Sequence, residues 1–413
     1  MSQPVYLIGA ARTDFKRNLA KERKRLRDIL TEAARGAIAV AGIDPGNVQS
    51  GLVGNFASGL FTRQLHLGAF LTEVDPKMRG IPTMHVEAAC ASGGAAVLAG
   101  AQQIMAGLHD VVLVGGVEQQ KTMPAAEGAD VLGAAGDYQA ERETYGQYLF
   151  PKLFARIATL YEARYGLRES QLARAAFKSR LHARLNPCAQ KRDDALTVEA
   201  ACAESADNPR VAPPLKVSDC SQITDGAAAV VLCSERFARS LGPARRAVRL
   251  LGFGHTTDYL PLERKDVPEF PIARRAAEKA YAMAGLAPSD IDAADVHDCF
   301  SISEIVAYEV LALAERGHGA ALLESGATVL PQARQDFGGG KPTRSIPVNP
   351  GGGLMGDGHP VGATGVRQVA EAFVQLTEQA GPRQVPGVRH YLTFNMGGSV
   401  TTSVVMIWGE NAD

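Results

Sequence analysis

The sequence contains no apolar run close to the roughly 20 residues that a membrane-spanning helix needs, so no membrane association is expected. It also has little net charge, because 43 Lys and Arg residues face 44 Asp and Glu residues, a balance of −1 at pH 7. Neither nucleic acid nor a membrane surface is therefore indicated as a partner. The first residues, Met1-Ser2-Gln3-Pro4, show no charged-then-apolar signal pattern, which predicts a cytoplasmic protein.

Cysteine is scarce, and its spacing fits neither metal binding nor cross-linking. The six cysteines include no Cys-x-x-Cys pair and have no histidine at ligand spacing, which argues against a zinc site and against a disulfide framework. Cys202 and Cys233 are interpreted as small core residues, because free cysteine is commonly buried. The glycine-rich stretch 351–365 lacks the Gly-Lys-Ser/Thr of a phosphate-binding loop. We expect no metal, nucleotide or flavin.

What the chain does contain is a repeat of itself. Residues 29–58 align without gaps with residues 272–301, and ten of the thirty positions are identical. Each copy is typical of an alanine-rich helix, a glycine that ends it, a proline turn and a short strand. Because a chain of 413 residues is too long for one simple core, the repeat indicates two related halves.

A second correspondence links the two halves. Cys90 precedes a small-residue segment, 91–105, that is predicted to be a helix leading into the strand 110–116. His359 precedes a predicted helix, 363–378, that also leads into a strand. Alternating strands and helices predict an α/β fold whose sheets are covered by helices. A pseudo-twofold relation would then bring Cys90 and His359 together across one pocket.

One long segment has no counterpart in the second half. The expected organisation is a first half made of 1–120 and 217–250, an inserted substrate-covering domain at 121–216, and a second half at 251–413. The insertion contains a basic run that could bind phosphate groups or could be solvated helix charge: Lys178, Arg180, Arg184, Lys191 and Arg192.

Cys90 and His359 carry the pattern of covalent chemistry. A thiol at a helix N-terminus lies at the positive end of the helix dipole, which predicts a thiolate. His359 lies in Gly358-His359-Pro360, where the proline fixes the backbone and the imidazole is held in place. A nucleophilic cysteine with a distant histidine as base indicates acyl transfer. We expect the Cys90 sulfur within roughly 4 Å of the His359 ring.

A third motif is His297-Asp298-Cys299-Phe300. If these residues continue the preceding strand, His297 and Cys299 alternate so that both point to one face and reach one pocket. Chemistry at a carbon next to a carbonyl needs an acid or base that is separate from the nucleophile, and this motif offers two candidates.

Together, Ala89–Gly93, His297–Phe300 and Gly358–Pro360 resemble the thiolase superfamily, and the His-Asp-Cys-Phe motif resembles its sterol-carrier-protein-2-type branch. The similarity extends from Ile8–Thr13 to Asn395–Gly398. It implies the five-layered α-β-α-β-α thiolase fold, built from two pseudo-symmetric halves plus a loop domain that receives coenzyme A. The implied activity is reversible cleavage of 3-ketoacyl-CoA by coenzyme A, in fatty acid or sterol side-chain metabolism.

The resemblance also implies a role for each motif residue. Cys90 would carry the acyl group, and His359 would take its proton and also donate to the thioester oxygen. Cys299 would move a proton at the α-carbon, since the Cys-x-Gly of many thiolases here reads Asn395-Met396-Gly397. His297 would hold a water or donate directly in a first oxyanion hole.

Three other residues receive an interpretation by the same resemblance. The N–H of Gly397, together with that of Cys90, would form a second oxyanion hole. Ser221 matches a serine that contacts the pantetheine arm in thiolases. Asn395 is interpreted as a structural turn residue.

The resemblance further implies the partners. Acyl-CoA and coenzyme A would be substrates, with no other cofactor, and the chain would form a homodimer or tetramer, with a small accessory protein in some relatives. Two alternatives stay open at this point. One is an acyltransferase that moves an acetyl group to a carbon nucleophile that is not a coenzyme A compound, and the other is a non-catalytic scaffold or lipid carrier with the thiolase fold.

Overall fold

The computed structural model describes residues 3–242, 246–338 and 340–410. The remaining residues are 1–2, 243–245, 339 and 411–413. They fall within the ranges predicted for the N-terminal segment and the domains, but they lie outside the described residues. In the described part, no helix is both long and apolar enough to cross a membrane.

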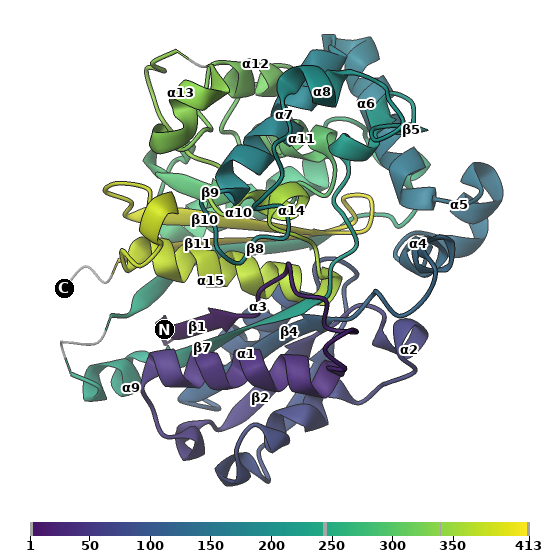
Figure 1. Ribbon diagram of the computed structural model, residues 1–413. Coiled ribbons are helices and arrows are strands. Elements are labelled where there is room, and N and C mark those ends of the chain that lie inside the picture. Colours follow the sequence, from purple (N-terminus) through teal and green to yellow (C-terminus); the bar gives the residue numbers. More distant parts are fainter. Residues whose placement is uncertain (1–2, 243–245, 339, 411–413) are drawn as a thin grey trace.

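The strands form one hydrogen-bonded sheet that consists of two halves (Figure 1). The first half has the order β3-β2-β4-β7-β1, and the second has the order β8-β11-β10-β9. The halves are joined through β1 and β8 by two residue pairs, Tyr6–Arg249 and Leu7–Val248. The strands are β1 (Val5–Arg12), β2 (Ser50–Gly54), β3 (Thr83–Val86), β4 (Val111–Glu118), β7 (Gly226–Ser234), β8 (Val248–Thr257), β9 (Ala293–Asp295), β10 (His390–Gly397) and β11 (Thr402–Glu410).

The two halves share one topology. β2 pairs with β4, and β9 with β10, in parallel. The next two ladders of each half, β4-β7-β1 and β10-β11-β8, are antiparallel. The second half even retains a trace of a strand equivalent to β3, because Val348 forms an isolated parallel bridge with Ala294 of β9. The internal repeat in the sequence therefore corresponds to a repeat in space.

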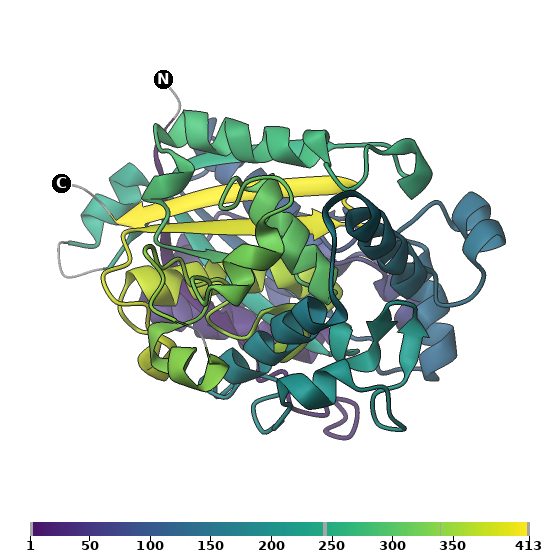
Figure 2. The same cartoon turned by 90° about the horizontal axis from the view of Figure 1, so that it is seen from above.

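Helices complete five layers. α3 (Ser92–Met105) and α15 (Thr364–Leu376) pack on each other between the two halves of the sheet. α15 contacts strands of both halves. α1 (Leu26–Ala41) covers the outer face of the first half, and α10 (Pro271–Ala284) covers that of the second. Figure 2 shows the second half from above, with β10 and β11 side by side. The predicted α-β-α-β-α arrangement is confirmed.

The outer helices approach their sheets at equivalent glycines. A Cβ on Gly9 of β1 would lie 2.4 Å from the Ala37 carbonyl oxygen of α1. In the second half, a Cβ on Gly252 of β8 would lie 2.2 Å from the Ala280 carbonyl oxygen of α10. Because only glycine fits at such distances, the alanine-rich helices and the glycine-bearing strands are matched within each half.

The connections between these elements carry the remaining helices. Between β4 and β7 lie α4 (Ala125–Gly133), α5 (Tyr138–Tyr145), α6 (Leu149–Tyr165), α7 (Glu169–Ala183), α8 (Val198–Cys202), β5 (Arg210–Ala212) and β6 (Leu215–Lys216). Between β9 and α15 lie α11 (Ser301–Val310), α12 (Gly319–Glu324), α13 (Arg334–Phe337) and α14 (Gly353–Gly356). Two short helices, α2 (Ser58–Phe61) and α9 (Glu235–Ser240), follow β2 and β7. α4 and α5 extend from one side of the molecule (Figure 1).

Candidate active site

Cys90 lies in a sharp turn between β3 and α3. Ala89, the residue before it, has a φ of 51°, a left-handed conformation that costs energy for a residue with a Cβ. The turn is closed by Ser92, whose hydroxyl donates to the Ala89 carbonyl oxygen at 2.6 Å and accepts from the Ala88 N–H at 2.9 Å. The strained turn therefore holds Cys90 just ahead of the first residue of α3.

His359 is held in a second turn, ahead of α15. Its N–H donates to the Thr224 hydroxyl at 3.0 Å, and its carbonyl oxygen accepts from the Gln120 side chain at 2.9 Å. The ring nitrogen Nδ1 lies 2.7 Å from the hydroxyl oxygen of Thr364, the first residue of α15. Backbone and ring are thus both fixed, as the Gly-His-Pro sequence predicts.

The His297–Phe300 segment does not lie in a strand. β9 ends at Asp295, and the four residues cross from there to the start of α11. The predicted strand alternation of His297 and Cys299 is therefore wrong. The segment is fastened instead by Asp298, whose carboxylate accepts from the Leu354 N–H at 2.6 Å, at a place where a Cβ on Gly353 would lie only 2.2 Å from that carboxylate.

The three motifs nevertheless converge. Side-chain atoms of Cys90, His297 and His359 all lie within 4.8 Å of one another, and the two imidazole rings meet edge to face with centroids 5.1 Å apart. Cys90, Cys299 and His359 line one cavity of about 240 Å³, and His297, which is 1% exposed, has a ring nitrogen within 4.8 Å of the Cys90 sulfur. The prediction that Cys90 and His359 face one pocket is confirmed.

The cavity is mostly apolar, and Phe56, Ser221, Gly398 and residues of the 121–216 segment also line it. The residues of that segment are Ala125, Ala129, Leu132, Ala135, Tyr148, Phe150 and Pro151. Phe300, at the end of the His297 motif, also lines the cavity and stacks on Phe154 of α6 with ring centroids 4.5 Å apart. The cavity therefore has walls from both halves and from the segment between β4 and β7.

Cys90 and His359 are both neutral at pH 7. Burial raises the pKa of Cys90 to about 12, although a hydrogen bond from the Gly398 backbone opposes the rise. Burial, helped by the positive charge of Arg367, lowers the pKa of His359 to about 3. The predicted resting thiolate is therefore wrong, because loss of solvation at Cys90 outweighs the favourable helix terminus.

The raised pKa makes a prediction about alkylation. We expect the rate at which iodoacetamide modifies Cys90 in the free protein to increase about tenfold per pH unit between pH 7 and 9, because only the thiolate reacts and its fraction grows by that factor below the pKa. Glutathione, an ordinary thiol, should level off near pH 9 under the same conditions. Peptide mass mapping measures the rate at Cys90, and a plateau already at pH 7 to 8 would contradict the neutral thiol.

At the end of β10, the structure contradicts the interpretation of Asn395 as a turn residue. Gly397 pairs with Thr402 inside the ladder, whereas Gly398, with a φ of 62°, lines the cavity, and its backbone hydrogen-bonds to the Cys90 sulfur. Asn395, interpreted as a turn residue, is buried within β10 and touches both the Cys90 turn and His297. In the sequence, Asn395 stands where many thiolases have the cysteine of Cys-x-Gly, which could have indicated a place at the site. Gly398 could have been noticed because it follows Gly397 directly.

The Ser221–Asp225 segment braces two of the motifs at once. The Ser221 N–H donates to the Cys299 carbonyl oxygen at 2.9 Å, and Ile223 forms a parallel bridge with His359. Ser221 therefore lies at the cavity, as expected, in a position fixed by its backbone. The segment holds the two motifs of the second half against the sheet of the first.

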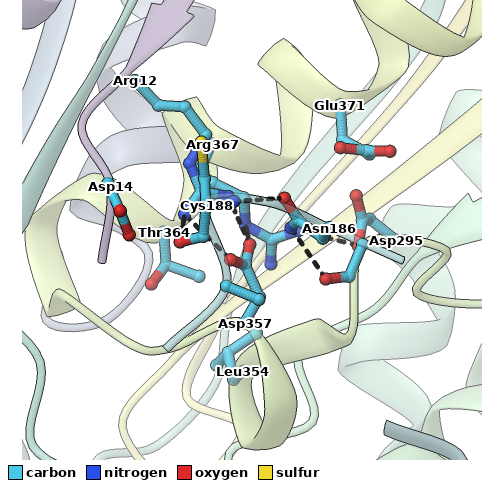
Figure 3. Close-up of polar contacts among 12 residues, drawn as sticks. Arg12, Asp14, Asn186, Cys188, Asp295, Leu354, Asp357, Thr364, Arg367 and Glu371 are labelled. Carbon is cyan, nitrogen blue, oxygen red and sulfur yellow. Dashed lines mark hydrogen bonds and ion pairs between the residues drawn. The ribbon is translucent and has the colours of Figure 1, made fainter. Parts of the chain in front are cut away.

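A mostly buried ionic network surrounds Asp357, two residues before His359 (Figure 3). Arg12, at the end of β1, binds both carboxylate oxygens of Asp357 at 2.5 and 2.8 Å. Arg367 of α15 binds Asp295 at 2.9 Å and approaches Asp357 at 3.6 Å. Burial lowers the pKa of both His297 and His359, and the charge of Arg367, which is 1% exposed and acts through protein, adds to the decrease.

Removal of Arg367 should therefore be costly. We expect Arg367→Leu to lose about 3–5 kcal/mol of unfolding free energy, because Asp295 would stay buried with its compensating charge removed, while Asp357 would keep its ion pair with Arg12. Urea unfolding measures the loss. Lys77→Ala, which breaks an exposed ion pair with Asp44, is the control and should leave the midpoint unchanged. A loss below about 1 kcal/mol for Arg367→Leu would contradict a structural role for the network.

Neither interpretation of the basic run, phosphate binding or solvated helix charge, holds for all of its residues. Lys178 is buried in α7 and paired with Glu304 of α11, and Arg180 is also buried. These two side chains are therefore internal parts of the fold, neither solvated helix charge nor free to bind phosphate.

Comparison with known proteins agrees with this geometry. The model of the thiolase N-terminal domain matches residues 5–207, and the model described as thiolase C-terminal domain-like matches residues 254–410. The chain belongs to the thiolase family.

Particular relatives extend over nearly the whole chain. An acetyl-CoA acetyltransferase of Methanothermobacter thermautotrophicus is 37% identical over 406 residues, covering 98% of this chain and 99% of that protein. Human sterol carrier protein 2 is 32% identical over 409 residues, covering 95% of this chain and 70% of that protein. A solved structure described as the Ltp2-ChsH2(DUF35) aldolase shares the fold, with a TM-score of 0.80 at 22% identity over 99% of this chain and 98% of that one.

Proposed function

We propose that this thiolase cleaves 3-ketoacyl-CoA with coenzyme A, and makes it in reverse, through an acyl group carried on Cys90. The observation that carries the proposal is the convergence of Cys90, His359 and Cys299 on one apolar cavity. A nucleophile, a base and a second thiol in one site are what covalent cleavage next to a carbonyl requires. The acetyl-CoA acetyltransferase relative supports the same reaction class.

His359 is the base in this scheme, and its hydrogen bonds indicate which nitrogen acts. Thr364 has a single hydroxyl hydrogen, and its oxygen lies 3.1 Å from the Pro360 carbonyl oxygen, which can only accept. Thr364 therefore accepts from Nδ1–H of His359. The lone pair is then on Nε2, the nitrogen available to a neutral thiol. Because the resting pair is uncharged, proton transfer accompanies attack rather than preceding it.

The reaction then runs in two balanced halves. Cys90 gives its proton to His359 as the sulfur attacks the keto carbon, and collapse of the adduct breaks the carbon–carbon bond. The departing acetyl-CoA enolate takes a proton from Cys299, which leaves an acyl thioester on Cys90. Coenzyme A gives its proton to the Cys299 thiolate and attacks the acyl group. Cys90 leaves as a thiolate and recovers its proton from His359.

Backbone N–H groups stabilise the oxyanion of each adduct. We assign this role to the N–H groups of Cys90 and Gly398, since the Gly398 backbone already hydrogen-bonds to the Cys90 sulfur. The sequence-based choice of Gly397 shifts by one residue in this proposal. Such preorganised donors act on charge that exists only along the reaction path.

Residues 121–216 form the substrate-covering domain in this proposal, between halves at 1–120 with 217–250 and at 251–413. This assignment is supported by the apolar side chains that the segment contributes to the cavity wall, from α4 and from the start of α6. Ser221, which also lines the cavity, would contact the pantetheine arm. The apolar lining favours acyl chains of fatty acids or sterol side chains.

The test is a panel of 3-ketoacyl-CoA esters of different chain length and branching. We expect loss of the ketoacyl absorbance when coenzyme A is added, with the fastest ester giving the preferred chain. No thiolysis of any ester by the folded protein would overturn the proposal.

Assembly and location complete the proposal. A homodimer or tetramer is supported by β3, an edge strand that pairs with β2 and exposes Met84 by 50%. A small accessory protein is supported by the two-component name of the aldolase that shares the fold. The six cysteines are all free, which fits the reducing cytoplasm. Light scattering, with and without a co-purified partner, measures the assembly.

A further inference from the structure

Asn395 connects the nucleophile turn to His297, and its amide has only one possible orientation. Its Oδ1 lies 2.9 Å from the Gly94 N–H of α3, which can only donate. Its Nδ2 lies 2.9 Å from the Cys90 carbonyl oxygen, which can only accept. Two partners with fixed roles therefore assign the oxygen and the nitrogen of the amide independently.

This orientation also determines the tautomer of His297. The Asn395 Nδ2 group has a second hydrogen, and it lies 3.3 Å from Nδ1 of His297. Because an amide nitrogen cannot accept, Nδ1 must accept and carries no proton. Burial lowers the pKa of His297 well below its usual value, so the ring is neutral and its one proton is on Nε2. His297 is thus the opposite tautomer to His359.

The surroundings of Asn395 are shaped for this side chain. A Cβ on Gly365 of α15 would lie 2.1 Å from Oδ1 of Asn395, and a Cβ on Gly94 would lie 2.7 Å from the same atom. Two helices of the middle layer therefore make room for the amide by having no side chain there. The position that carries a second thiol in many thiolases is here occupied by a hydrogen-bonding bridge.

We propose that Asn395 is a positioning residue that keeps His297 as a hydrogen-bond donor, with Nε2–H directed to the thioester oxygen of the substrate. The inference rests on the proposed thiolysis, in which the enolate formed on carbon–carbon cleavage places negative charge on that oxygen. The two histidines then have separate roles, because His359 presents a lone pair and His297 presents a proton.

The tautomer of His297 also affects whether the catalytic residues can bind a metal ion. Cys90, His297 and His359 have ligand spacing, and among the described residues they are the one such group of three. A metal needs a lone pair from each imidazole. In His297 the Nδ1 lone pair is occupied by Asn395, and Nε2 carries the proton. Asn395 thus disfavours capture of a zinc ion by the catalytic residues.

Asn395→Asp tests the role of the amide in turnover. A carboxylate at this place can only accept, so it should draw the His297 proton to Nδ1 and leave a lone pair where the donor was. We expect kcat for thiolysis to fall about 100-fold, the lower end of the loss of one oxyanion donor, with KM changed less than about threefold. Asn395→Ala, which removes the bridge without reversing it, should lose about tenfold.

The matched control is Thr393→Val, a nearly isosteric change two residues earlier on the same buried strand, whose hydroxyl donates a long hydrogen bond of 3.5 Å to the Met406 carbonyl oxygen. It should keep kcat within about twofold. A kcat of Asn395→Asp equal to that of Thr393→Val would overturn the proposal.

A second measurement does not depend on turnover. Protein labelled with ¹⁵N-histidine gives two-bond ¹H–¹⁵N spectra that report which ring nitrogen is protonated, and His297→Gln identifies the His297 signals. We expect protonated Nε2 in the wild type and protonated Nδ1 in Asn395→Asp. Protonated Nδ1 in the wild type would overturn the inference. Protonated Nε2 in a wild type that cleaves no 3-ketoacyl-CoA would support the tautomer and overturn the proposed function instead.

Discussion

Cys90→Ala is expected to lower the rate of thiolysis by about 10⁴-fold or more, because removal of a covalent nucleophile eliminates the acyl intermediate rather than weakening one contact. Cys90 lies in a turn and lines the cavity, so the shorter side chain should leave the fold intact. Intact-protein mass spectrometry after incubation with an acyl-CoA should detect an acyl adduct on the wild type and none on the variant.

Cys202→Ala is the matched control for this experiment, since Cys202 ends α8 and does not line the cavity. It should form the adduct and turn over at the rate of the wild type. Turnover by Cys90→Ala within tenfold of the wild type, or an acyl group found on another cysteine, would contradict a covalent mechanism through Cys90.

Cys299→Ala should separate the two chemical halves of the reaction. Loss of a general acid or base typically costs 10²- to 10⁴-fold, and we expect thiolysis of 3-ketoacyl-CoA to fall by about that factor. Acylation of Cys90 by a simple acyl-CoA should survive, because that step breaks no carbon–carbon bond. Stopped assays for thiolysis and mass spectrometry for the adduct measure the two halves on the same sample.

Two outcomes would show that the second thiol has another role. One is normal thiolysis by Cys299→Ala, and the other is an acyl group on Cys299 of the wild type. Cys299 has a polar neighbour in the Ser303 hydroxyl, 3.6 Å away. Ser303→Ala should therefore have an effect much smaller than that of Cys299→Ala, since it removes a neighbour of the acid rather than the acid itself.

The sequence predicted those features that depend on local pattern. The alanine-rich helices and their glycine ends gave the repeat, and the repeat gave the relation between Cys90 and His359 across the layers. Those inferences succeed because helix periodicity and turn chemistry are properties of short segments. The Gly-His-Pro turn succeeds for the same reason.

The failures concern properties that arise only when distant segments meet. The helix terminus argument for a Cys90 thiolate was correct locally, but burial by other segments determines the pKa. Asn395 acquires its role only because α3 and His297 pack against β10. Arg367 looks like an ordinary helix residue in the sequence, and its buried partners come from β9 and from the turn before His359.

The pseudo-twofold relation has a consequence for the origin of such a site. Two identical halves assembled about an exact axis would present the same side chain twice, a thiol facing a thiol or an imidazole facing an imidazole. A proton acceptor opposite a proton donor requires the two copies to differ, and joining them in one polypeptide lets each position vary alone. The shared frame of Gly9 with Ala37 and Gly252 with Ala280 could stay fixed while the centre became asymmetric. Because the two halves are joined in one polypeptide, the cavity can hold a proton acceptor on one side and a proton donor on the other.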